Sequence, residues 1–319
     1  MSMFKIVITE PINEKGVEYL KENEVNVIEL QPGSSQKDLL RLSKEYDALI
    51  TRGGVKISRE VLEKSPKLKV VGVHGIGCDH VDLDAAREKG IIVCNTPDAL
   101  TVTVAEMTIG LILSVLRNIV SADKAVRTGE WNRKYSDLIG FELSGKTVGI
   151  IGMGRIGQAT AERLRALGAR IIYWSRTRKE QVEKAFGFEW REFNELLTQS
   201  DIISLHIPGT PNTHHLIGKQ EFNEMKDGVI IVNTARGKVI DEKALIECIN
   251  SGKIASAGLD VFENEPLSPD NPLCKLDNVV LTPHLGASNH EGMERMALQV
   301  ADCVLKSLKG EIPDNPVVI

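Results

Sequence analysis

Short apolar runs rich in β-branched residues alternate with longer amphipathic stretches along almost the whole chain. In the first third, five such runs predict strands, at residues 4–9, 25–30, 48–51, 70–74 and 91–95. The amphipathic stretches between them predict helices, at residues 13–23, 37–46, 59–64 and 84–89. Strands that alternate with helices form parallel βαβ units, with helices on both faces of one sheet. The alternation therefore predicts an α/β domain.

A second βαβ series follows a long helical stretch at residues 98–120. Its six predicted strands match a doubly wound dinucleotide-binding fold, and they lie at residues 147–151, 170–174, 202–206, 229–233, 255–260 and 279–282. A last helix is predicted at residues 289–308, and we expect it to return to the first domain. The sequence thus predicts two doubly wound parallel-sheet domains, one from residues 1–100 and 288–319 and the other from 101–287.

The composition is typical of a globular protein and excludes several classes. A length of 319 residues suggests two domains. The chain has 39 basic and 44 acidic residues, so we expect no nucleic-acid partner. The longest apolar stretch, Met107–Leu116, is too short to cross a membrane, and no secretory leader is visible. Five scattered cysteines without a CxxC pair favour the reducing cytoplasm.

A glycine-rich loop follows the predicted strand at residues 147–151 directly. Gly152, Gly154 and Gly157 form a GxGxxG motif with Arg155 and Ile156, and the motif opens a helix. The first glycine permits a tight turn, the second lets the backbone approach a pyrophosphate, and the third lets helix and strand pack closely. This context favours dinucleotide binding, with an ordinary structural turn as the alternative.

The segment about 20 residues further on bears on the choice of cofactor. An NAD-preferring site carries an acidic residue there, which holds the ribose 2′-hydroxyl. This chain has Ser175, Arg176 and Thr177 instead, with no acidic residue between Arg163 and Lys179. Hydroxyl and guanidinium groups suit a 2′-phosphate, so the sequence favours NADP(H). The alternative is a solvated basic loop, with NAD(H) as a possible cofactor.

The chain resembles the D-2-hydroxyacid dehydrogenase family over essentially its whole length. The resemblance rests on the order and spacing of six motifs, GCDHVD at 77–82, NTP at 95–97, the GxGxxG, NTARG at 233–237, GLDVF at 258–262 with EP at 265–266, and TPHLG at 282–286. It implies a flavodoxin-like substrate domain and a Rossmann cofactor domain, with the active site in the cleft between them. Residues 173–179 and 95–101 look like NADPH-dependent glyoxylate/hydroxypyruvate reductases, whereas residues 284–288 look like 3-phosphoglycerate dehydrogenases.

Three motifs carry residues that suit reduction of a 2-oxo acid. Arg236 has a planar guanidinium that can hold a carboxylate and polarise a carbonyl. His284 can donate a proton near neutral pH, and Glu265 would favour its imidazolium form. The resemblance implies these same roles. Taken alone, each residue would more often belong to an ordinary surface, loop or turn.

Further residues are expected mainly from the resemblance. Asp260 would accept a hydrogen bond from the nicotinamide carboxamide, unless it only caps a turn. The cofactor would also be lined by His206, Pro208, Thr234, Ala235, His284 and Gly286. Backbone amides of Gly75, Ile76 and Gly77 would reach the substrate carboxylate, unless they form a simple tight turn. Arg52 is a candidate phosphate contact or a plain surface charge.

The other histidines do not suggest a metal site. They are scattered in the sequence, and His214 and His215 are neighbours, which point to opposite faces of an extended segment. We therefore expect no metal.

Together these features predict a cytoplasmic oxidoreductase. It would transfer hydride between NADP(H) and a small D-2-hydroxy or 2-oxo acid, with glyoxylate or hydroxypyruvate as the substrate. The main alternative is a D-3-phosphoglycerate dehydrogenase that uses NAD. A nucleotide-sensing protein like the C-terminal-binding corepressors is a further alternative. The resemblance also implies a homodimer, with the long helix near residues 98–120 at the interface.

Overall fold

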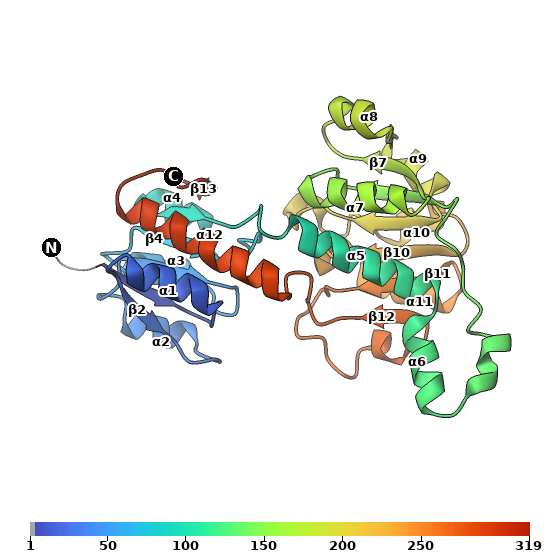
Figure 1. Ribbon diagram of the computed structural model, residues 1–319, viewed down its shortest axis with the longest axis horizontal. Coiled ribbons are helices and arrows are strands. Elements are labelled where there is room, and N and C mark those ends of the chain that lie inside the picture. The colour runs from blue at the N-terminus through green and yellow to red at the C-terminus, as the bar shows by residue number, and fades with distance from the viewer. Residues whose placement is uncertain (1–3) are drawn as a thin grey trace. The chain divides into compact units, whose positions relative to one another are not determined.

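The computed structural model describes residues 4–319. The chain divides into two compact units. One comprises the chain up to Thr103 together with Ala287–Ile319, and the other is Val104–Gly286 (Figure 1). Each unit has its own parallel sheet with helices, as the alternating pattern predicted.

The first unit contains a six-stranded sheet in the order β13-β5-β4-β3-β1-β2. Its strands are β1 (Lys5–Ile8), β2 (Asn26–Glu29), β3 (Ala48–Thr51), β4 (Val70–Val73), β5 (Ile92–Cys94) and β13 (Pro316–Val318). Its helices are α1 (Glu14–Glu22), α2 (Gln36–Arg41), α3 (Arg59–Lys64), α4 (Leu83–Lys89) and α12 (His290–Leu308), with the start of α5 (Thr101–Leu116) at the boundary. The five parallel strands follow the flavodoxin-like order, and only β13 is antiparallel.

Alternate residues of each strand in this unit point to opposite faces of the sheet, and each face has its own hydrophobic core. Ile6 and Ile8 of β1 pack with α1 and α12, whereas Val7 packs with α2, α3 and α4. Both layers are needed to cover a parallel sheet, whose strands are apolar on both sides.

The second unit contains a seven-stranded parallel sheet in the order β12-β11-β10-β9-β6-β7-β8. Its strands are β6 (Thr147–Ile151), β7 (Arg170–Trp174), β8 (Glu189–Trp190), β9 (Ile202–Leu205), β10 (Val229–Asn233), β11 (Ile254–Leu259) and β12 (Val279–Leu281). This is the doubly wound dinucleotide-binding order extended by one strand, and the strand order reverses between β6 and β9.

Helices cover both faces of this second sheet as well (Figure 1). They are α5, α6 (Ile119–Arg127), α7 (Arg155–Ala166), α8 (Glu180–Phe186), α9 (Phe193–Gln199), α10 (Lys219–Glu224) and α11 (Glu242–Asn250), with short 3-10 helices η1 (Trp131–Tyr135), η2 (Pro211–Thr213), η3 (Gly237–Val239) and η4 (Pro272–Lys275). Residues of α5 and α7 pack on one face, and residues of α9, α10 and α11 pack on the other.

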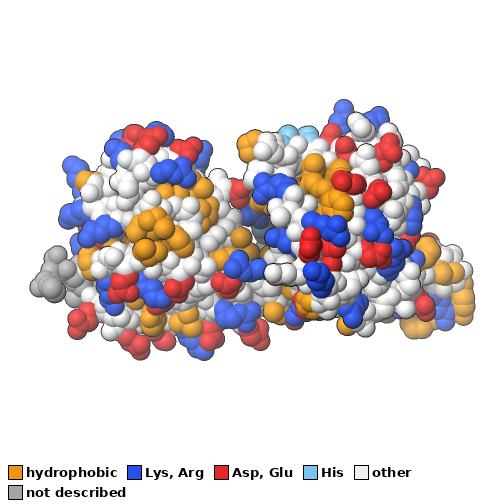
Figure 2. Space-filling view, turned by 90° about the horizontal axis from the view of Figure 1, so that it is seen from above, with side chains coloured by type: hydrophobic (Ala, Val, Ile, Leu, Met, Phe, Trp, Pro, Cys, Tyr) orange, Lys and Arg blue, Asp and Glu red, His pale blue; other side chains and the backbone are white. Residues whose placement is uncertain are grey.

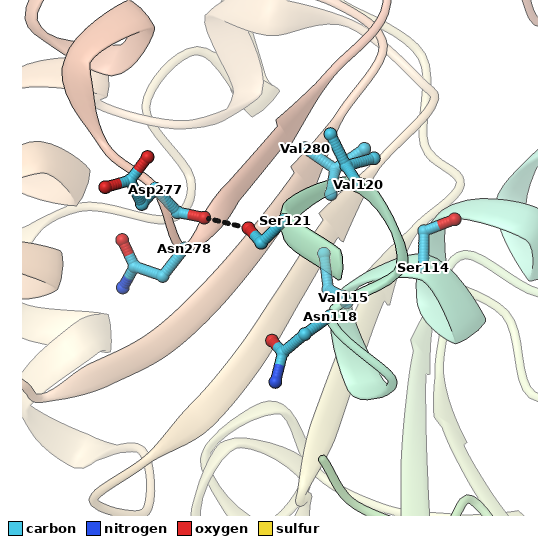
Figure 3. A pocket seen from close by; sticks show the side chains of 8 residues that line it. All are labelled: Ser114, Val115, Asn118, Val120, Ser121, Asp277, Asn278 and Val280. Atoms are coloured by element: carbon cyan, nitrogen blue, oxygen red, sulfur yellow. Dashed lines mark hydrogen bonds between the residues drawn. The ribbon is translucent and has the colours of Figure 1, made fainter. Parts of the chain in front are cut away.

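The prediction of one long helix at residues 98–120 is wrong, because two helices, α5 and α6, occupy this stretch. Asn118 adopts a left-handed conformation with φ 52°, and this residue separates α5 from α6. The two helices are bent by 61° relative to one another. Ser121 of α6 donates to the carbonyl of Asp277, 3.0 Å away, beside a small pocket that Val115 and Val280 help to line (Figure 3).

Among the described residues, no single helix is long and apolar enough to cross a membrane. The bent pair of α5 and α6 reaches the required length and composition only when the two helices are taken together.

Candidate active site

The three predicted catalytic residues lie in loops that follow neighbouring strands of the second unit. Arg236 follows β10, Glu265 follows β11 and His284 follows β12. The carboxyl ends of parallel strands share one edge of the sheet, which is where such sheets bind ligands. His284 Nδ1 lies 2.8 Å from Glu265 Oε2, so the structure brings this pair into a hydrogen bond.

The electrostatics of the pair favour a protonated imidazole. The hydrogen bond to Glu265 raises the pKa of His284, against opposing effects of burial and of the positive charge of Arg236. Burial raises the pKa of the Glu265 carboxyl, but hydrogen bonds from His284 and from the Phe262 amide, with the charge of Arg236, lower it overall. Arg236 therefore lies close enough to act on both partners, and all three predicted residues form one charged cluster.

The turn that presents His284 is held by Asp260. His284 has a left-handed backbone with φ 54°, and its amide donates to the Asp260 and Thr282 carbonyls at 2.9 and 3.0 Å. Asp260, only 1% exposed, accepts hydrogen bonds from the Thr282 hydroxyl and from the amides of Leu285 and Gly286, at 2.6, 2.7 and 2.7 Å. Both oxygens thus cap this turn, as the structural alternative for Asp260 predicts.

The Arg236 turn is also fixed by its neighbours. Asn233 donates from Nδ2 to the Arg236 carbonyl at 3.0 Å, and its Oδ1 accepts the Ala235 amide at 2.9 Å. A Cβ on Gly237 would collide with the backbone of Phe262, so only glycine lets η3 pack against the loop that carries Glu265. Sequence reasoning quoted Asn233 and Thr282 within motifs but assigned them no role, because their partners come from the fold.

The glycine-rich loop joins β6 to α7 at the point where the strand order reverses. Gly152 has φ 104°, and a Cβ there would collide with the His206 carbonyl after β9. A Cβ on Gly157 would collide with the Gly152 carbonyl, so this glycine allows close helix–strand packing. At Gly154, by contrast, an added Cβ would meet no heavy atom within 4 Å. The protein does not need glycine there, but a pyrophosphate above the helix N-terminus would need the space.

The basic segment after β7 is exposed and contains two differently placed arginines. Arg178 forms an ion pair with Glu183 at 2.8 Å, and its guanidinium lies over the Trp190 ring. Arg176 is exposed and forms no hydrogen bond or ion pair with any residue in the described range 4–319. Ser175 Oγ donates to the Thr177 carbonyl at 2.8 Å, so these three predicted residues form a tight turn.

Two further predicted segments lie along the same sheet edge. His206 follows β9, burial lowers the pKa of its imidazole to about 4, and Nε2 lies 2.9 Å from Ser204 Oγ. His206 is therefore neutral at pH 7 and is unsuited to donate a proton. Thr234, after β10, shares a 2.8 Å hydrogen bond with Thr108 of α5. Pro208 and Ala235 extend the same two loops, beyond His206 and Thr234.

Apart from Arg236, the predicted substrate residues belong to the first unit, at the carboxyl ends of β3 and β4. Arg52 Nη1 donates to the Pro11 carbonyl at 2.7 Å. Glu10, which sequence reasoning missed, accepts the amides of Arg52 and Val55, each at 2.9 Å, and thereby fixes this turn. No sequence signal marks Glu10, since its partners lie more than forty positions away.

In the loop after β4, the Gly75 amide donates to the Val73 carbonyl at 2.9 Å. The Gly75 amide would have to leave this bond to reach a substrate carboxylate, so its role stays a prediction. Asn95 donates to the Ile76 carbonyl at 2.8 Å and supports the same loop. The amides of Ile76 and Gly77 stay candidates.

Known proteins resemble this chain in sequence and in fold. The family profile of the D-isomer specific 2-hydroxyacid dehydrogenase NAD-binding domain matches residues 109–286. The glyoxylate reductase of Pyrococcus furiosus is 45% identical, over 98% of this chain and 95% of its own length. The D-3-phosphoglycerate dehydrogenase of Methanocaldococcus jannaschii is 46% identical over 99% of this chain, and the chain spans 59% of that relative.

Solved structures extend the likeness to three dimensions. One is the NADPH-dependent glyoxylate/hydroxypyruvate reductase of Sinorhizobium meliloti in complex with NADP and malonate. It is 31% identical, with a TM-score of 0.88 over 99% of this chain and 97% of that protein. A glyoxylate reductase from Paecilomyes thermophila is 35% identical, with a TM-score of 0.90 and 99% coverage of both chains. On this evidence, the chain belongs to the D-isomer specific 2-hydroxyacid dehydrogenase family.

Proposed function

We propose that the chain transfers hydride between NADP(H) and a small D-2-hydroxy or 2-oxo acid, with glyoxylate or hydroxypyruvate as its substrate. The hydrogen-bonded pair of His284 and Glu265 beside Arg236 carries this proposal. The names of the relatives support the substrate class, because six of them that are 42–45% identical are glyoxylate reductases.

In the reducing direction, Arg236 would hold the substrate carboxylate and polarise the carbonyl oxygen with its planar guanidinium. His284 would donate a proton from Nε2 to the developing alkoxide, while its Nδ1 stays bonded to Glu265. NADP(H), when bound, supplies the hydride. Glu265 keeps the imidazole protonated and oriented, so that the acid is ready before hydride transfer.

The preference for NADP(H) rests on the turn after β7. Arg176 is the exposed guanidinium with no carboxylate partner among the described residues, whereas Arg178 is paired with Glu183. We assign the 2′-phosphate to Arg176, with Ser175 and Thr177 beside it. Binding of NAD(H) remains the alternative, because the family profile that matches this unit is that of an NAD-binding domain.

The second candidate is a D-3-phosphoglycerate dehydrogenase that uses NAD. The 46% identical relative from Methanocaldococcus jannaschii favours it. So does Arg52, because its guanidinium donates to the neutral carbonyl of Pro11 and to the sulfur of Met293, and among residues 4–319 it has no carboxylate partner that would compete with a phosphate. The amides of Ile76 and Gly77 would hold the carboxylate in either case.

A matrix of three oxo acids and two reduced cofactors tests the proposal. We expect turnover with glyoxylate or hydroxypyruvate above that with phosphohydroxypyruvate, and a KM for NADPH well below that for NADH. A clear preference for phosphohydroxypyruvate with NADH would establish the second candidate. Loss of NADPH oxidation with all three acids would reject hydride transfer to this substrate class.

The assembly state and location are also proposals. The predicted interface helix, α5, is largely buried within its own unit, so the apolar surface lies further along, on α6 and the segment to Phe141. Ile119, Val126, Tyr135 and Phe141 are 51, 59, 73 and 59% exposed. Figure 2 shows hydrophobic side chains at this end of the unit. We assign this surface to a homodimer contact. The five free cysteines suit a reducing cytoplasm.

A further inference from the structure

We propose that His215, Asp241 and Glu263 form a binding site for one divalent ion of the Zn²⁺ class, separate from the hydride-transfer residues. Their ligand atoms all lie within 4.8 Å of one another, and all three residues are partly buried. Each comes from a different segment of the second unit. His215 lies between η2 and α10, Asp241 is the N-cap of α11, and Glu263 is in the loop after β11.

The donor set suits a borderline-soft metal. His215 Nε2 lies 2.7 Å from Glu263 Oε1, and imidazole with carboxylate is a combination that Zn²⁺, Co²⁺ and Ni²⁺ accept. Donors about 2.1 Å from a tetrahedral ion lie about 3.4 Å apart. The contact between His215 and Glu263 would open slightly, and Asp241 would bind the ion while its Oδ1 still accepts the Ala244 amide at 3.0 Å. Three protein ligands leave a fourth position for water.

The local charge points to a cation independently of these distances. Glu242 adds a third carboxylate, because the amide of Glu242 donates to Glu263 Oε1 at 3.0 Å and the amide of Glu263 donates to Glu242 Oε2 at 3.3 Å. Within residues 4–319, no lysine or arginine forms an ion pair with Asp241, Glu242 or Glu263. A divalent ion would supply the missing positive charge.

The ion would brace a loop that matters for the proposed reaction. Glu263 lies two residues before Glu265, and Gly237 of the same turn region packs against Phe262. A metal bridge between His215, Asp241 and Glu263 would tie three segments together around that loop. The site is thus a structural clamp, and it does not take part in proton or hydride transfer.

Titration of the full-length, metal-stripped protein with Zn²⁺ and Co²⁺ tests this proposal. We expect one Zn²⁺ per chain, a higher Tm with the metal, and Co²⁺ bands in the visible range without the near-ultraviolet band of a thiolate ligand. His215→Gln removes one ligand and should weaken Zn²⁺ binding by about 100-fold. Asp241→Asn keeps the helix cap and Glu263→Gln keeps the hydrogen bond to the Glu242 amide, so both should weaken binding without unfolding.

His214→Gln is the matched control, because His214 stacks on His215 at 4.0 Å but is not in the cluster. It should leave the affinity within about twofold, a difference worth less than half a kcal/mol. Unchanged affinity in His215→Gln, or no stoichiometric binding to the wild-type protein, would overturn the proposal. Neither readout uses hydride transfer, so the outcome is independent of the proposed function.

Discussion

At the scale of single residues, His284 occupies a backbone conformation that histidines adopt rarely. A left-handed residue other than glycine costs about 1–3 kcal/mol unless its surroundings stabilise it. The surroundings here are two hydrogen bonds from its own amide and the bond from its imidazole to Glu265. Glycine would relieve the strain but would remove the imidazole. The left-handed backbone disfavours histidine at this position, so its presence there supports a function for the imidazole side chain.

Replacement of His284 by alanine tests that role directly. We expect His284→Ala to lower kcat by about 10²–10⁴-fold, the usual contribution of general acid catalysis. NADPH binding, followed by the fluorescence of the nicotinamide, should change little, because the side chain acts on the substrate. Turnover near that of the wild type would show that another group donates the proton.

We expect Glu265, the partner of this histidine, to set the pH range of the proposed reaction. Because Glu265 raises the pKa of His284, the imidazolium that acts in reduction is present below the raised pKa and is lost as pH rises through it. Glu265→Gln removes the negative charge, so the alkaline limb of the profile of kcat against pH should move to lower pH. An alkaline limb that stays at the same pH would show that Glu265 does not affect the pKa of the proton donor. Glu247→Gln, on an exposed part of α11, is the control.

The proposed contact of Arg176 with the 2′-phosphate predicts that this residue discriminates between the two cofactors. A charge-assisted hydrogen bond contributes about 1.5–3 kcal/mol, so Arg176→Ala should raise the KM for NADPH by about 10–100-fold. The KM for NADH should not change, since NADH has no phosphate there. Arg178→Ala, which loses the pair with Glu183 instead, should affect both cofactors alike. Equal losses for both cofactors in Arg176→Ala would contradict the assignment.

At the scale of elements, two glycines of the glycine-rich loop are expected to have different roles, Gly157 in folding and Gly154 in cofactor binding. Gly157→Ala places a Cβ against the Gly152 carbonyl, and overpacking of this kind costs about 1–3 kcal/mol of stability. Gly154→Ala meets open space and has an ordinary φ of −80°, so stability should change by less than about 0.5 kcal/mol. Its affinity for NADPH should nevertheless fall at least about tenfold. Thermal unfolding and cofactor titration of both variants distinguish the two effects, and unchanged affinity in Gly154→Ala would place the pyrophosphate elsewhere.

Most strands were predictable because they are short apolar runs. Β-branched residues fill β6, β9 and β10, and the predicted bounds of these strands agree with the structure to within a residue. The two strands that were missed lack such a run. Strand β8 is only two residues long, Glu189–Trp190. Strand β13 begins at Pro316 and pairs antiparallel at the sheet edge. Their pairing depends on where the fold brings the chain, which no local pattern records.

The break between α5 and α6 could not be predicted because the local sequence pattern continues across it. Apolar residues continue on both sides of Arg117 and Asn118, so periodicity alone joins the two helices. In the candidate site, too, some features could be predicted from the sequence and others could not. Motifs located Arg236, Glu265 and His284, whereas the capping of the His284 turn by Asp260 joins residues 22 to 26 positions apart and depends on the fold.

At the scale of the whole molecule, the C-terminal helix completes the core of the first unit. Val300 and Val304 of α12 lie over Gly72 of β4, where any Cβ would meet both side chains. Gly16 of α1 makes an equally close approach to Ala297. The sheet of this unit therefore has one face covered by α1 and α12 together. The first hundred residues alone would leave the part of that face under α12 exposed, which explains why the unit is discontinuous.

The exposed apolar surface of the second unit leads to a prediction about assembly. Large apolar side chains in contact with water are unfavourable, and patches of this kind mark interfaces in soluble proteins. Val126→Glu with Phe141→Glu would place two charges on residues that are each 59% exposed in the single chain. We expect the wild-type protein to sediment as a dimer and the double variant as a monomer. Thermal unfolding should show that each unit of the variant stays folded, because neither side chain belongs to a core cluster.

Ile312→Glu provides a matched control, because Ile312 is 70% exposed and lies in the first unit, outside this surface. A charge there should leave sedimentation unchanged if the contact is specific to α6 and the segment to Phe141. A monomeric wild type would reject the homodimer. Dissociation by Ile312→Glu, but not by the Val126 and Phe141 pair, would move the interface to the first unit. The position at which an added charge dissociates the chains therefore tests the proposed dimer contact. The amount of exposed apolar surface alone does not test it.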